Sequence, residues 1–148
     1  MPITQDTHFL MFRVVLGLII GMALLPTRAL AEEAKAFTCL FKTGNAFSYE
    51  KTKFKREKTS PVTLDIRDID AANQSARLVS GERTTQLRVI QAISAVHVLE
   101  VAGEGYLNIT TIYARDARTG DYPAVHARHF GVLGQPIVSN YRGTCTPR

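Results

Sequence analysis

The chain has 148 residues, of which 45% are hydrophobic and 21% charged, so it is long enough for one domain with a real core. Lysine and arginine outnumber aspartate and glutamate by 18 to 13, which gives a formal net charge of +5. Neither of the two cysteines belongs to a C-x-x-C pair, and this spacing disfavours a redox or metal role for them.

Residues 1–31 have the layout of a secretory signal peptide. Arg13 supplies a positive charge, residues 14–25 form an unbroken apolar stretch, and small residues precede a cleavage site after Ala31. The apolar stretch is shorter than the roughly 20 residues that a membrane-spanning helix needs. We therefore expect a periplasmic or secreted protein that is not an integral membrane protein after processing. A retained anchor is the alternative, and Met11 is an alternative start to the first methionine.

Residues 32–148 are predicted to form a single all-β domain. Many short segments alternate in polarity or are rich in β-branched and aromatic residues, and turn-like sequences separate them. Eight or nine short strands in this order indicate an antiparallel meander, and a barrel is preferred over a sandwich. The expected strands are 36–42, 46–55, 62–68, 75–81, 84–92, 95–102, 106–114, 124–130 and 136–145.

The two cysteines lie near the ends of this domain, Cys39 in its first expected strand and Cys145 in its last. In an oxidising compartment such a pair normally forms a disulfide. A disulfide between the first and last strands also suits a sheet whose ends meet, which is the reason for preferring a barrel. Two free thiols are the alternative.

Three histidines are the candidates for a metal site. His126 and His129 are three residues apart, so on a strand they point to opposite sides of the sheet. His97 and Glu100 lie in another expected strand, and zinc needs three or four ligands around one point. We expect these histidines to make ordinary polar contacts, and a metal site or enzyme that uses His97, His126 and His129 is the alternative.

A second candidate is a basic face. Lys51, Lys53 and Lys55 alternate in the sequence, so a single strand would place them on one side. Export argues against a nucleic-acid partner, which leaves an anionic envelope surface or an acidic protein. A solvated edge strand that is protected by its lysines from sheet association explains the same pattern.

Tyrosines near strand ends suggest a third candidate. Tyr106 begins one expected strand and Tyr122 lies in the turn before another, and tyrosine hydroxyls can bind a ligand at the mouth of a small barrel. Closing the core is the alternative and the more frequent use of such tyrosines.

The function predicted from these features is that of an exported binding or interaction protein. Its partner is a small ligand, an anionic envelope surface or a protein, and no cofactor is implied. An enzyme is disfavoured because the chain has no G-x-S-x-G motif and its acidic residues show no catalytic spacing.

Overall fold

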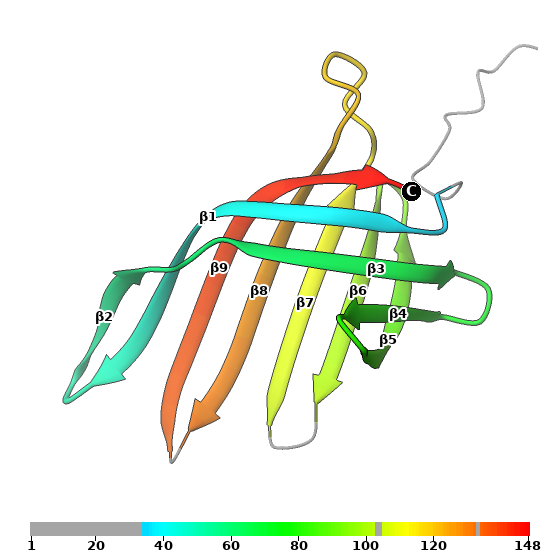
Figure 1. Ribbon diagram of the computed structural model, residues 1–148. Coiled ribbons are helices and arrows are strands. Elements are labelled where there is room, and N and C mark those ends of the chain that lie inside the picture. The colour runs from blue at the N-terminus through cyan, green and yellow to red at the C-terminus, as the bar shows by residue number, and fades with distance from the viewer. Residues whose placement is uncertain (1–33, 103–104, 133) are drawn as a thin grey trace, which may run out of the picture.

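The computed structural model describes residues 34–102, 105–132 and 134–148, which form nine antiparallel strands (Figure 1). The predicted signal peptide lies outside these residues, as does the site of its cleavage. No helix in the described ranges is long and apolar enough to cross a membrane. The strands are β1 (Phe37–Glu50), β2 (Lys53–Lys58), β3 (Val62–Asp70), β4 (Ser75–Ser80), β5 (Arg83–Ala92), β6 (Ala95–Ala102), β7 (Tyr106–Tyr113), β8 (Tyr122–Val132) and β9 (Gln135–Pro147).

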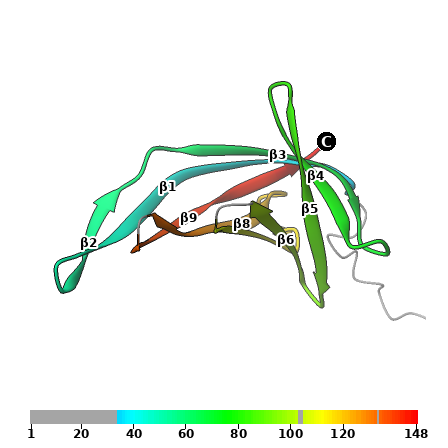
Figure 2. The ribbon, with the colours of Figure 1, turned by 90° about the horizontal axis from the view of Figure 1, so that it is seen from below.

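The sheet closes on itself because β1 pairs with β9 as well as with β3. Strands β1 and β3 to β9 therefore form a closed barrel of eight strands, and closure leaves these strands without a free edge. Viewed from below, β1 and β3 lie on the opposite side of the lumen from β6 and β8 (Figure 2). The structure confirms the all-β meander and the barrel.

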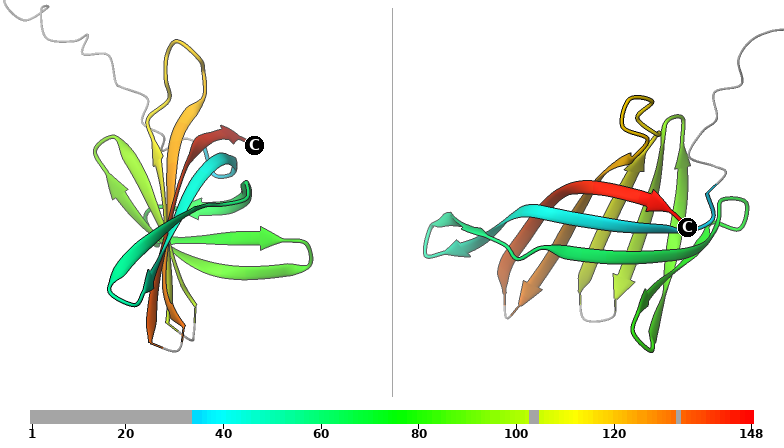
Figure 3. Two further views of the ribbon diagram at one scale, coloured as in Figure 1. Left: turned by 90° about the vertical axis from the view of Figure 1, so that its left-hand side faces the viewer. Right: turned by 45° about the horizontal axis from the view of Figure 1, so that its top comes forward.

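Strand β2 pairs with the C-terminal end of β1 and strand β3 pairs with its N-terminal end, and both pairings follow the same register. Glu50 pairs with Lys53 beside the turn, and Phe37 pairs with Ile66 at the far end. The β1–β2 hairpin extends away from the barrel (Figure 3). The single strand expected over residues 46–55 is wrong, because the chain reverses there and Lys51 has a φ of 58°. A left-handed residue is typical of a tight hairpin turn.

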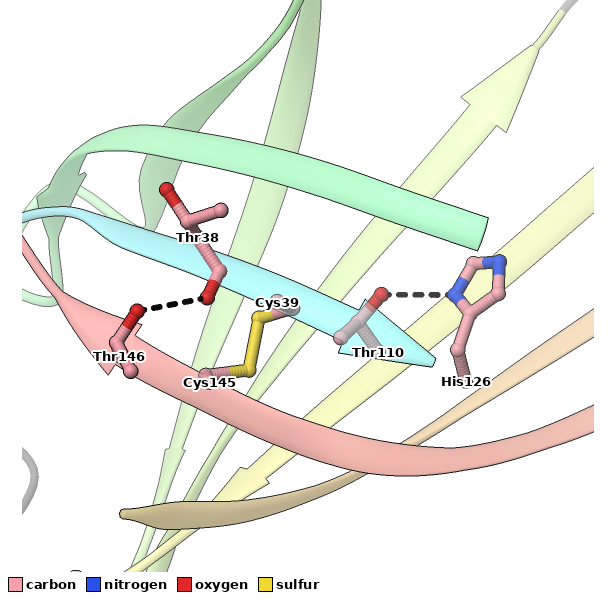
Figure 4. The surroundings of a disulfide bond; sticks show 6 residues. All are labelled: Thr38, Cys39, Thr110, His126, Cys145 and Thr146. Carbon is pink, nitrogen blue, oxygen red and sulfur yellow. Dashed lines mark hydrogen bonds between the residues drawn. A yellow bond between two sulfur atoms is a disulfide. The ribbon is translucent and has the colours of Figure 1, made fainter. Parts of the chain in front are cut away.

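The disulfide crosses the seam where the barrel closes. Cys39 of β1 pairs directly with Cys145 of β9, with 3.9 Å between the two Cα atoms and both side chains fully buried (Figure 4). This confirms the predicted link between first and last strands. The register of the same pair shifts between Leu40 and Thr43, which is the position of a β-bulge.

The core fills one end of the barrel with apolar side chains. Alternate residues of each strand point inward, as the period of two requires. Phe37, Phe41, Ile66 and Ile112 are the largest side chains that are completely or almost completely buried there. Polar side chains occupy neighbouring inward positions in contact with this core, as shown by the ring centroids of Phe41 and His126, which are 5.5 Å apart, and these polar residues form the candidate site.

Candidate functional site

The three candidate histidines do not meet. His126 points into the barrel and is only 3% exposed. His97 lies on the outer face of β6, where its Nδ1 is 3.0 Å from the hydroxyl oxygen of Thr111. His129 is exposed on the outer face of β8. Among the described residues no three His, Cys, Asp or Glu side chains are grouped to hold a metal ion. A site made from all three histidines would require rearrangement of the sheet.

His126 is held on both ring nitrogens. Its Nδ1 is 2.9 Å from Oγ1 of Thr110 on β7, and its Nε2 accepts a hydrogen bond of 3.1 Å from Nε of Arg128 (Figure 4 shows the first contact). Because Arg128 is always a donor, Nε2 must carry a lone pair. The proton of the neutral ring is therefore on Nδ1, which donates to Thr110.

Two causes keep this imidazole neutral. Burial is the larger one, and the positive charge of Arg128 adds to it; together they lower the pKa of His126 from 6.5 to about 4. The Arg128 guanidinium also lies 5.8 Å above the ring centroid of Tyr141, which is a cation–π distance. His126 is therefore neutral at physiological pH, and contacts to both ring nitrogens hold its ring in place.

A second pair lies beside this group on the inner face. Asn108 of β7 donates from Nδ2 to Oε2 of Glu100 on β6 over 2.7 Å. The carboxylate fixes the orientation of the amide, because a flipped amide would place two acceptors against each other. Oδ1 of Asn108 is buried and has no protein partner among the described residues.

The space beside His126 inside the barrel is small. The cavity between Leu64, Leu87, Asn108 and His126 has a volume of about 10 Å³. A single water needs roughly 10–15 Å³. Oδ1 of Asn108 is a suitable acceptor for such a water. A metabolite does not fit in this cavity, so the inner polar cluster is a packed interior with little room for a ligand.

The structure separates the three lysines of the expected basic face. Lys51 lies in the hairpin turn, whereas Lys53 and Lys55 lie on β2. Lys55 Nζ is 3.0 Å from a carboxylate oxygen of Glu57 and 3.8 Å from one of Glu50. The hydrogen bond to Glu57 and the charge of Glu50 raise the pKa of Lys55. The line of free positive charge expected from alternation is therefore broken by a turn and by two acidic neighbours.

The two tyrosines of the expected mouth lie at opposite ends of the barrel. Tyr106 stacks on Phe130 with ring centroids 5.2 Å apart, whereas Tyr122 packs edge-on against Phe37 at 5.0 Å. Tyr122 and Phe130 are both on β8, and about 3.4 Å per residue separates them by roughly 27 Å. Both tyrosines lie near the start of a strand, but they are far apart because β7 and β8 pair antiparallel, which places the start of one strand beside the end of the other.

Asn108 and Thr110 are the members of the cluster that sequence analysis missed. Both alternate with buried Ile112 on β7, so the period of two already places them on the inner face. Their partners become visible only from the register, in which Asn108 lies opposite Arg128 and Thr110 lies opposite His126.

The fold and this cluster define a small, closed antiparallel barrel whose interior is closely packed around His126. No protein-family model matches the chain, and no curated protein or solved structure is significantly similar to it.

Proposed function

We propose that this protein is an exported binding protein that contacts its partner with the outside of its barrel. The observation that carries the proposal is the packed interior around His126. Apolar core side chains and the polar cluster together line a cavity of only about 10 Å³ there. Barrels that carry a ligand inside need a far larger space, of roughly 300 Å³ or more.

The outer face of the barrel differs in polarity from one side to the other, which supports the same proposal. One row of cross-strand neighbours on five adjacent strands has four apolar members, Val101, Leu107, Val138 and Phe47, and is here named the outer apolar row; His129 lies in it between Leu107 and Val138. Val101 is 74% exposed. On the hairpin next to this row, Phe54 is 56% exposed and packs against Tyr49. Contiguous apolar side chains on a surface are typical of interaction sites.

The opposite side of the barrel carries more polar and charged side chains. The outward positions of β3 are Thr63, Asp65 and Arg67, and Arg67 forms an ion pair with Asp65 over 2.6 Å. Among the outward positions of β5, Gln86 and Arg88 are polar, whereas Ile90 is 44% exposed. Exposed apolar side chains on this side are therefore isolated, which supports the outer apolar row as the side that contacts a partner.

The export part of the proposal rests on two features. A buried disulfide is consistent with an oxidising compartment, and residues 1–31 have the composition of a signal peptide. The site of action would then be the periplasm or the exterior of the cell.

Photo-crosslinking tests the proposal. A photoreactive phenylalanine analogue replaces Phe54 or Val101 in the outer region, and Thr63 or Gln86 on the polar side serves as the matched control. All four positions are exposed, so the substitutions should not disturb the fold. In the compartment to which the protein is exported, we expect discrete adducts from the first pair and none from the second. Equal adducts from both sides, or none from either, would refute the proposed contact face.

A further inference from the structure

A hollow on the outer surface lies where the β-bulge of β1 meets the end of β2. Its charged lining consists of Lys42, Arg56, Lys58 and Arg142, and these four residues are here named the basic hollow. Thr43, Gly44, Asn45 and Thr59 complete the lining, and the volume is about 360 Å³.

Strand pairing explains why these side chains gather. Lys58 of β2 pairs with Asn45 on one side of β1, and Arg142 of β9 pairs with Thr43 on the other side. The bulge at residues 40–43 adds Lys42 to the same region. Neighbouring strands are about 4.8 Å apart, so cations on β2 and β9 lie roughly 10 Å from each other across β1. That span is comparable to the size of a small phosphorylated molecule.

The four cations are not matched by acids. On β2 the period of two places Lys55 and Glu57 on one face, where they pair, and Arg56 and Lys58 on the other. Within the described part of the chain no carboxylate oxygen lies within 4.0 Å of a side-chain nitrogen of Lys42, Arg56, Lys58 or Arg142. Four like charges around one hollow repel each other, and a bound anion would relieve that repulsion.

The hollow also has oriented donors. Arg56 donates from Nε to Oδ1 of Asn45 over 2.8 Å, which directs its guanidinium and leaves its two terminal nitrogens available. Arginine presents a planar fork that matches phosphate, and two arginines contribute to this site. Thr43 and the amide of Asn45 are neutral groups that can bind hydroxyls of a ligand.

We propose that the basic hollow binds a phosphoryl group carried on a small hydroxylated group, such as a sugar phosphate. The proposal rests on the proposed function, since it places a ligand on the outside of the barrel, but it concerns other side chains than the outer apolar row, which it adjoins where Arg56 pairs with Phe47. The volume exceeds what a single phosphate requires, and the lining has no acidic residue that would repel one. The phosphoryl group can come from a soluble molecule or from a lipid headgroup, because both present the same chemistry.

Calorimetric titration with glucose 6-phosphate tests the soluble source, with glucose as the uncharged control. Phosphatidylcholine vesicles that contain phosphatidylinositol 4-phosphate, compared with vesicles that contain phosphatidylinositol instead, test the lipid source, because only the first lipid carries a phosphoryl monoester on its hydroxylated ring. Binding of either phosphorylated probe at physiological salt, without binding of its control, supports the proposal and identifies the source. Failure of both phosphorylated probes would overturn it.

Two triple variants with equal loss of charge locate the binding. Lys42→Gln/Arg56→Gln/Arg142→Gln removes three charges from the hollow, and Lys51→Gln/Lys53→Gln/Lys55→Gln removes three from the neighbouring hairpin. The first variant loses hydrogen bonds between charged groups, so we expect its affinity for the phosphorylated probe to fall at least about tenfold. In the second variant we expect the affinity to fall less than about twofold. Equal losses in both variants would show general charge attraction and refute the site.

A variant that keeps the charge excludes misfolding as the explanation. Arg56→Lys/Arg142→Lys retains both positive charges at exposed positions but removes the planar forks. We expect weaker binding of the phosphorylated probe with an unchanged thermal midpoint. Unchanged affinity in this variant would contradict phosphoryl recognition by the two arginines. Crosslinking from Phe54 and Val101 is measured separately, so failure of the hollow and failure of the proposed function can be distinguished.

Discussion

Arg128 donates a hydrogen bond from its Nε to Nε2 of His126, two residues earlier on the same strand and the same inner face of the barrel. A permanent cation thus contacts a buried imidazole, and the contact requires the imidazole to be neutral. Together with burial, it makes protonation of His126 unfavourable in the folded state but not in the unfolded chain. The stability of the barrel should therefore depend on pH in a specific window.

Acidification from pH 6.5 to about 4 should destabilise the protein through His126. The folded pKa of about 4 lies below the ordinary 6.5, so only the unfolded chain takes up this proton in that window. The stabilising contribution is complete above pH 6.5 and is lost as pH falls to about 4, with a total of about 3 kcal/mol. Urea unfolding at a series of pH values measures this loss.

The variant His126→Gln supplies the control for this measurement. It lacks the titrating ring but keeps the carboxylates, including Asp65 and Asp70, whose lowered pKa values cause a separate loss at lower pH. The difference in free energy of unfolding between wild type and His126→Gln should shrink as the pH falls from 6.5 to 4. An imidazole pKa near 6.5 for His126 in the folded protein, measured by NMR, would contradict the account.

Loss of the disulfide should destabilise the barrel at its seam. The paired substitution Cys39→Ala/Cys145→Ala removes a link between residues 106 positions apart, and we expect a loss of about 2–5 kcal/mol in the free energy of unfolding. Thiol titration of the denatured wild-type protein should find no free thiol. Two titratable thiols, or unchanged stability in the variant, would refute the role assigned to the disulfide.

Gly143 should not tolerate a side chain. A Cβ at this position would lie 2.8 Å from Cα of Phe41 and would overlap the carbonyl oxygen of Leu40 at the bulge. Gly143→Ala should cost about 1–3 kcal/mol, because the backbones of β1 and β9 must separate. Gly131→Ala on β8 is the matched control, since its nearest atom is 4.0 Å away, and it should change stability by no more than about 0.5 kcal/mol. An equal loss of stability in Gly143→Ala and Gly131→Ala, measured by thermal or urea unfolding, would contradict the close approach of the backbones at the seam.

Export should remove residues 1–31. The small residues before Ala31 predict a mature protein that begins at Glu32. Intact-mass measurement of material recovered from the exported fraction determines the first residue. Retention of the apolar stretch 14–25, or a membrane-bound product, would show that the segment acts as an anchor.

Much of the fold could be predicted because alternation and turn chemistry are local. Residues 62–68 alternate cleanly, and β3 forms there with Leu64 and Ile66 buried. The spacing of Cys39 and Cys145 also predicted which strands meet. The turn at Lys51 was missed because no glycine, proline or asparagine marks it in the sequence, and the alternating lysines continue the strand pattern through it.

The site was harder to predict because it depends on which strands are neighbours and in which register. Sequence analysis placed His126 and His129 on opposite faces, and the strand period alone was sufficient for this. It could not place Lys42 and Arg56 beside Arg142, because that group exists only through the bulge and the closure of β1 on β9. Nor could it find the acidic neighbours of Lys55, which depend on the hairpin turn.

Native mass spectrometry of the protein recovered from the compartment to which it is exported distinguishes a partner bound outside the barrel from a ligand bound inside it. Any bound species should persist in the inner-face variants Asn108→Ala and Arg128→Gln and be lost in variants of the outer apolar row or the basic hollow. A stoichiometric small molecule that disappears in the inner-face variants and persists in the outer ones would contradict binding on the outside.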